Sequence, residues 1–281
     1  MKINQLNPII IISPGRSGST LLQRYLNLSD KLIIWGEHAG FISGLAQMYS
    51  DFIEDAAAQR NIISGLRNVD LIMRSQPITN RGIEWTNNFT SDVFLNGIRD
   101  FLINLFSKDV DDQQRWGFKE IRYLEKEYNF ISDLFPDVQF IFLVRNPLDT
   151  LASMIAAREK DKWPSVFFSR KSQKAIIEKY ANRILERISA IYNFSKEKQN
   201  FIIIRYEDLV KDPQEVLDYI FKFLGVATPE VQKIELISNS YLSVMEKDSI
   251  KHDINKYHRK NKVFKELSLV YENIDFFQEG L

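Results

Sequence analysis

Cysteine is absent from the 281-residue chain, and its absence excludes three kinds of chemistry. Without a thiol, the protein has no disulfide scaffold, no thiolate metal site and no cysteine nucleophile. Histidine is scarce as well: the chain has three, His38, His252 and His258, and they form no pattern of metal ligands, so we expect that no metal is required. The lack of cysteine fits a reducing compartment, and we expect a cytoplasmic protein.

An excess of one charge and long apolar runs are also missing. The 37 Lys and Arg residues balance 37 Asp and Glu residues. Proteins that bind nucleic acid usually carry an excess of positive charge, so we expect no nucleic-acid partner. Any anion site must then be local. The longest apolar runs, such as residues 9–12 and 140–144, are far shorter than the ~18–20 residues that cross a bilayer. Residues 9–12 end directly in Ser13-Pro14-Gly15-Arg16 without a cleavage site, which favours a first strand over a signal peptide.

Apolar and aromatic residues, in contrast, are plentiful. Hydrophobic residues make up 44% of the chain and aromatic residues 12%, with 20 phenylalanines, which is enough for a large buried core. No repeat, low-complexity stretch or linker divides the sequence. We therefore expect one domain over residues 1–281, although length alone would allow about two.

Short apolar runs alternate along the chain with segments of helical spacing. Runs typical of buried strands cover residues 8–12, 31–35, 116–120, 138–144 and 201–204. Helical patterns cover residues 20–28, 92–106, 176–192 and 216–224, and a further helix begins at Asn146-Pro147. This alternation predicts an α/β fold, with a central parallel β-sheet flanked by helices. Ligands of such sheets bind beyond the carboxyl ends of the strands, so the segments that follow these runs are candidate sites.

Residues 13–20 join the first predicted strand to a helix and have the composition of an anion-binding loop. Between a strand and a helix, backbone N–H groups and the helix N-terminus can face an anion. Glycines let the anion approach closely, and hydroxyl side chains can donate to it. An alternative is a turn in which Ser and Thr merely cap the helix. The residues expected to contact the anion are Pro14, Gly15, Arg16, Ser17, Gly18, Ser19 and Thr20.

This loop differs from the P-loop of nucleoside triphosphatases at two decisive positions. Ser13 stands where that motif begins with Gly, and Ser19 stands where it has Lys. Arg16 is the only cation of the loop, so the usual clamp for magnesium-dependent phosphoryl transfer is missing. The sequence therefore predicts that a different anion is bound.

Two motifs together resemble the sulfotransferases that use 3′-phosphoadenosine 5′-phosphosulfate (PAPS). Residues 13–20 resemble their 5′-phosphosulfate loop, and residues 142–147 with 151–154 resemble their 3′-phosphate site. The resemblance extends from about Pro8 to Gly225 and is to bacterial and tyrosylprotein sulfotransferases in particular. It implies a P-loop-like three-layer fold, PAPS as the co-substrate and adenosine 3′,5′-bisphosphate as the product.

The resemblance also implies further nucleotide contacts. Arg145 and Ser153 would bind the 3′-phosphate, for which a guanidinium fork is well suited. Tyr206, in the segment 205–209, would contact the nucleotide. The alternatives are an Arg145 paired with Asp149 at a helix start, and a Tyr206 that only packs.

The catalytic roles follow the same resemblance. Glu37 is the expected general base, a role that calls for partial burial of its carboxyl group, and His38 is the second candidate because histidine titrates near neutrality. Lys119 would contact the leaving group, and with Arg16 it would offset the charge on the bridging oxygen. The alternatives are a surface Glu37–His38 pair and a Lys119–Glu120 pair on an edge strand.

The acceptor side carries the fewest signals. We expect a helical and loop cap from about residues 40–110 and 155–175, with Phe41, Met48 and Tyr49 as possible pocket residues. The segment 158–170, which holds Trp163-Pro164 and Phe167-Phe168, and the basic segment 247–262 are expected to close over the site, although a solvated basic loop is equally consistent with the latter. The basic residues in question are Lys251, His252, Lys256, His258, Arg259 and Lys260.

A sulfotransferase acting on a small molecule or carbohydrate, at a hydroxyl or an amine, is the leading hypothesis. Its rivals are a degenerate P-loop nucleotide kinase and a non-catalytic nucleotide-binding domain of the same fold. Dependence on ATP and magnesium would favour the kinase. Loss of transfer in Glu37→Ala with retained nucleotide affinity would separate an enzyme from a binding domain.

Overall fold

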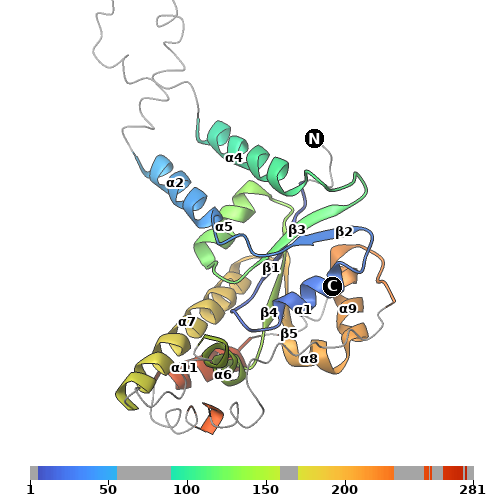
Figure 1. Cartoon of the computed structure of the whole chain (residues 1–281). Coiled ribbons are helices and arrows are strands. Elements are labelled where there is room, and N and C mark those ends of the chain that lie inside the picture. Colours follow the sequence, from blue (N-terminus) through green and yellow to red (C-terminus); the bar gives the residue numbers. More distant parts are fainter. Residues whose placement is uncertain are drawn as a thin grey trace, which may run out of the picture.

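Five parallel strands form the centre of the protein. The computed structural model describes residues 6–55, 90–158, 170–230, 250–252, 254, 262–274 and 276 (Figure 1). The strands are β1 (Ile9–Ile12), β2 (Leu32–Trp35), β3 (Arg115–Glu120), β4 (Gln139–Val144) and β5 (Phe201–Arg205), and their order in the sheet is β2-β3-β1-β4-β5. The predicted α/β fold with a central parallel sheet is confirmed, and the predicted strands match within two residues at either end.

Strand β1 is central, and its four isoleucines are at most 2% exposed. It pairs with β3 on one side and β4 on the other, with Ile9 opposite Gly117 and Gln139. The approach of β3 is very close: a Cβ atom on Gly117 would lie 2.1 Å from the carbonyl oxygen of Ile9. Glycine at this position therefore allows the sheet to form around β1.

Helices cover both faces of the sheet (Figure 1). They are α1 (Ser19–Leu26), α2 (Ile42–Glu54), α4 (Ser91–Phe106), α5 (Glu125–Leu134), α6 (Pro147–Arg158), α7 (Arg170–Glu197), α8 (Tyr206–Lys211), α9 (Pro213–Leu224) and α11 (Lys262–Glu272). The sequence analysis did not predict α5, α8 and α11. None of the helices in these described ranges is long and apolar enough to cross a membrane.

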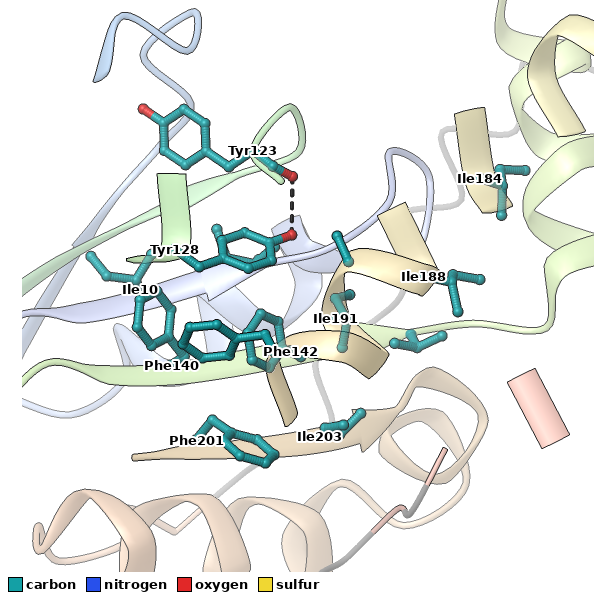
Figure 2. Close-up of a cluster of buried hydrophobic side chains, with 14 of the residues drawn as sticks. Ile10, Tyr123, Tyr128, Phe140, Phe142, Ile184, Ile188, Ile191, Phe201 and Ile203 are labelled. Carbon is teal, nitrogen blue, oxygen red and sulfur yellow. Dashed lines mark hydrogen bonds between the residues drawn. The ribbon is translucent and has the colours of Figure 1, made fainter. Parts of the chain in front are cut away.

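The alternation of side chains along the strands divides the core into two layers. On one face, Ile10, Phe140 and Phe142 pack with α5 and α7, and the Tyr128 hydroxyl donates to the carbonyl of Tyr123 at 3.0 Å (Figure 2). On the other face, Ile9 and Ile141 pack against apolar residues of α1 and α9. The loops at the carboxyl edge therefore project from a sheet that is packed on both faces.

The expected cap falls partly outside the described residues. Within it, α2 and α4 contact one another and lie side by side (Figure 1). Residues 56–89 and 159–169, with Trp163-Pro164 and Phe167-Phe168, lie outside the described part of the chain, as do Lys256, His258, Arg259 and Lys260. The cap and the division into a single domain remain predictions.

Candidate active site

The carboxyl ends of all five strands meet at one edge of the sheet because the strands are parallel. The segments that leave this edge carry most of the residues singled out in the sequence. Arg16 follows β1, Glu37 follows β2 and Arg145 follows β4, while Lys119 lies at the end of β3. Tyr206 follows β5 as the first residue of α8.

The loop after β1 has the backbone of an anion-binding turn. Arg16 and Gly18 adopt left-handed conformations, with φ of 70° and 92°. Gly18 is the N-cap residue of α1, and no side chain in the described part of the chain caps that helix. Glycine has no side chain to cap the helix, and the Ser17 hydroxyl before it has no hydrogen-bond partner among the described residues, which argues against the simple capped turn. Within the loop, Pro14, Gly15, Ser17 and Ser19 are buried, and Arg16 and Thr20 are exposed.

The loops after β1 and β4 contact each other directly. Arg145 Nη1 donates to the main-chain oxygen of Arg16 at 3.4 Å, and Arg16 Nε donates to Ser153 Oγ at 3.3 Å. The Arg145 guanidinium lies 4.7 Å above the centre of the Tyr206 ring, where a cation–π contact is favourable. The structure therefore gathers Arg16, Arg145, Ser153 and Tyr206 at one place.

Tyr206 also explains why position 18 is a glycine. A Cβ atom on Gly18 would lie 2.3 Å from Cδ2 of the Tyr206 ring, and the φ of 92° is itself unfavourable for other residues. The Tyr206 ring therefore packs on the loop of residues 13–20 and also lies under Arg145. Both contacts are packing contacts, as the alternative for Tyr206 expected. A contact between Tyr206 and the nucleotide remains a prediction.

Asp149, the alternative partner of Arg145, is paired elsewhere. Its Oδ1 lies 2.6 Å from Lys251 Nζ, so the described part of the basic C-terminal segment is fastened to the first turn of α6. Ile250 and Ile254 beside it are each 1% exposed. His252 is exposed. Lys251 therefore ties the described residues 250–252 to α6, the helix that carries Ser153.

A second cluster, of carboxylates and cations, lies where β2 and β3 end. Glu37 Oε1 accepts from Lys119 Nζ at 2.7 Å, and Glu37 Oε2 accepts from Arg122 Nη1 at 3.3 Å. The Glu37 side chain is 31% exposed and that of Lys119 is 7% exposed. About a third of the Glu37 side chain is therefore open to solvent, and the buried Lys119 of β3 pairs with it.

Arg122 and Glu120 belong to the same cluster, and the sequence analysis did not identify either as a site residue. Glu120 is fully buried and accepts from Arg122 Nη1 at 2.6 Å. Its carboxylate also accepts from the backbone N–H of Ile121 at 2.8 Å and of Gly40 at 3.0 Å. Only the adjacency of β2 and β3 reveals this network, because Gly40 and Glu120 are far apart in the chain.

His38 points into an aromatic cage. Its Nε2 is hydrogen-bonded to the Tyr123 hydroxyl at 2.5 Å. The ring stands edge-on to Phe41, Phe106 and Phe118, with centroids 4.9, 5.4 and 4.5 Å away. Burial lowers the pKa of His38 below its usual 6.5, although Glu120 opposes the shift. The residue is therefore a neutral core histidine at pH 7.

This burial predicts an acid-sensitive fold. Below pH 6.5 the unfolded chain protonates His38 while the folded chain does not, so stability falls as the pH falls toward the lowered folded value. We expect His38→Gln to reduce the loss of unfolding free energy between pH 7.5 and 5.5, as measured by urea denaturation. An equal loss in both proteins would contradict this assignment.

The other candidate pocket residues have mixed surroundings. Phe41 is half-buried and stacks on Phe106 at 6.3 Å, and Tyr49 stacks on Phe94 at 6.4 Å. Met48 on α2 is 45% exposed. Phe41 and Tyr49 thus contribute to packing, whereas the apolar side chain of Met48 is exposed at the surface.

The fold defines a class, the P-loop-like α/β proteins, and in this chain the loops after β1 and β4 meet at the same sheet edge as a carboxylate and a lysine. Among the described residues, no group of three or more His, Cys, Asp or Glu could hold a metal ion. The profile of the sulfotransferase family matches residues 8–230, and the chain belongs to this family.

Individual relatives agree with this membership. A protein-tyrosine sulfotransferase of Drosophila melanogaster is 26% identical over 137 residues, which is 49% of this chain and only 26% of that protein. The sulfotransferase domain of the Synechococcus PCC 7002 olefin synthase has a TM-score of 0.56 and 17% identity, over 96% of each chain. A sulfotransferase from Alicyclobacillus acidocaldarius has a TM-score of 0.53 and 17% identity, over 95% of this chain and 97% of that one. These likenesses confirm the P-loop-like fold.

Proposed function

We propose that this sulfotransferase moves a sulfonyl group from PAPS to a hydroxyl group, or an amine, of a small molecule or carbohydrate, with Glu37 as the general base. The observation that carries the proposal is the contact between the two predicted anion-binding segments. Arg145 donates to the main chain of Arg16, and Arg16 donates to Ser153. Two anionic ends of one nucleotide would fit such an arrangement, because each end meets its own arginine.

Buried polar atoms at these segments support an anionic ligand. Ser13 Oγ, Ser17 Oγ and Arg145 Nε are buried and have no hydrogen-bond partner among the described residues. Such groups are costly unless a ligand or water satisfies them. In the proposed complex, Ser17 and the loop N–H groups would hold the 5′-phosphosulfate, and Arg145 with Ser153 would hold the 3′-phosphate.

The proposed reaction is an in-line displacement at sulfur. The acceptor oxygen forms a bond to sulfur, and its proton passes to the Glu37 carboxylate. The bond between sulfur and the 5′-phosphate oxygen breaks, and its electron pair leaves with adenosine 3′,5′-bisphosphate. Lys119 and Arg16 would offset the negative charge that grows on the leaving oxygen.

The surroundings of Glu37 and His38 favour Glu37 as the base. The Glu37 side chain is 31% exposed at the sheet edge, next to Lys119. His38 Nε2 is occupied by the Tyr123 hydroxyl, and the ring is enclosed by aromatic side chains. An acceptor could therefore reach the Glu37 carboxylate but not the histidine nitrogen that faces Tyr123.

A transfer assay with radiolabelled PAPS tests the function. The full chain is incubated with the donor and a panel of phenols, sugars, amines and a tyrosine peptide, with and without a chelator. We expect label to move to one acceptor class, with release of adenosine 3′,5′-bisphosphate and no effect of the chelator. Phosphate transfer from ATP and magnesium would point instead to a kinase, and nucleotide binding without transfer to a binding domain.

A further inference from the structure

Glu37 is held by two cations that have different surroundings. Lys119 Nζ lies 2.7 Å from Oε1, and the lysine side chain is 7% exposed. Arg122 Nη1 lies 3.3 Å from Oε2, and the arginine side chain is 44% exposed. In the proposed function, Lys119 is also required at the leaving group, so its contact with Glu37 cannot be the one that holds the base throughout the reaction.

Arg122 has an anchor that Lys119 lacks. The same Nη1 atom that contacts Glu37 donates to Glu120 Oε1 at 2.6 Å. Glu120 is 0% exposed, and a carboxylate so buried must be satisfied by donors. The N–H groups of Ile121 and Gly40 also donate to it, at 2.8 and 3.0 Å, and His38 Nε2 lies 4.0 Å from its Oε2. Arg122 is therefore hydrogen-bonded to a carboxylate, that of Glu120, which is fully buried and has further donors of its own.

Glu120 also holds the backbone that follows Glu37. Ala39 and Gly40 both adopt left-handed conformations, with φ of 61° and 72°. For alanine this conformation is strained and persists only where surrounding contacts hold it. The bond from Gly40 N–H to Glu120 Oε2 is such a contact. Glu120 thus restrains the Glu37 segment twice, through the main chain and through Arg122.

We infer that Arg122, anchored on Glu120, is the positioning residue that keeps the Glu37 carboxylate in place when Lys119 turns to the sulfonyl donor. Arg122 contacts neither the donor nor the reacting atoms in this account, and it acts only through Glu37. The inference rests on the proposed function, because it assumes that Glu37 is the base. It adds a residue pair, Arg122 and Glu120, whose chemistry the sequence did not reveal.

A double-mutant cycle tests this role. Arg122→Gln is expected to lower kcat of sulfonyl transfer about tenfold, because a loosely held base is misplaced, and to leave the Kd of adenosine 3′,5′-bisphosphate unchanged. In the Glu37→Gln background, the same substitution should have no further effect on the residual rate. A purely structural role would lower the rate equally in both backgrounds. Arg24→Gln, at the exposed last turn of α1, is the matched control and should leave kcat unchanged.

The outcomes separate the inference from the function on which it rests. Unchanged kcat in Arg122→Gln, or an undiminished effect in the Glu37→Gln background, would overturn the positioning role while sulfonyl transfer itself stands. Absence of transfer by the wild-type chain would overturn the proposed function, and a Glu37→Gln enzyme of full activity would overturn the base assignment and the inference with it.

Discussion

Replacing Glu37 with glutamine is expected to lower the rate of sulfonyl transfer by about 10²- to 10⁴-fold, the usual contribution of a positioned general base. Glutamine has nearly the same shape, and its amide oxygen can still accept from Lys119 or Arg122, but it cannot take a proton at neutral pH. The affinity for adenosine 3′,5′-bisphosphate should remain. The measurement is the initial rate of label transfer, with calorimetry for the bisphosphate.

Glu215→Gln is the control for this substitution. Glu215 is an exposed residue of the first turn of α9, and its loss of charge should leave the rate unchanged. A Glu37→Gln enzyme as fast as the wild type would show that the proton goes elsewhere. A simultaneous loss of bisphosphate binding would show that Glu37 supports the nucleotide site rather than the acceptor.

Arg145→Ala is expected to weaken the binding of adenosine 3′,5′-bisphosphate about 10- to 100-fold, since a hydrogen bond to a charged group contributes about 1.5–3 kcal/mol. The change removes the cation–π contact with Tyr206 and the hydrogen bond to Arg16 as well. Arg145→Lys should recover only part of the affinity, because lysine has no guanidinium fork.

A calorimetric titration of each variant measures this effect, with thermal unfolding as the check on folding. Arg24→Ala, which removes an exposed arginine of α1, should bind like the wild type. An Arg145→Ala protein that folds normally and binds with an unchanged Kd would remove Arg145 from the nucleotide site.

Most of the sheet could be predicted because its strands are continuous apolar runs. The isoleucines of β1 and residues 140–144 of β4 are buried on both faces, and such runs need no tertiary information to be recognised. Helix α5 was missed because its buried residues, Tyr128, Ile131 and Leu134, form a short pattern after the charged start at Glu125. Its stability comes from packing on the sheet, which local spacing does not express.

The meeting of the loops after β1 and β4 was easier to predict than the cluster around Glu37, and the reason is topological. Arg16 lies in the loop after β1 and Arg145 directly follows β4, so the parallel sheet brings both to one edge. The contacts of Glu37 with Lys119 and Arg122 depend on the pairing of β2 with β3, which the order of strands along the chain does not reveal. The aromatic surroundings of His38 could not be predicted for a related reason: its neighbours Phe106 and Phe118 come from other elements.

The resting arrangement of the cluster has a consequence for the reaction order. Lys119 and Glu37 form an ion pair at 2.7 Å, so neither is fully available for its proposed task. Binding of the anionic donor would attract Lys119 and free one oxygen of Glu37 for the acceptor. The donor should therefore bind before a productive acceptor complex forms.

Comparative calorimetry of the unmodified chain tests the nucleotide assignment most directly. Adenosine 3′,5′-bisphosphate and adenosine 5′-monophosphate differ only in the 3′-phosphate that Arg145 and Ser153 are proposed to hold. We predict one site per chain, with the bisphosphate bound at least about tenfold more tightly, as one charge-assisted contact would give. Equal affinities for the two ligands, or no binding of either, would contradict the account.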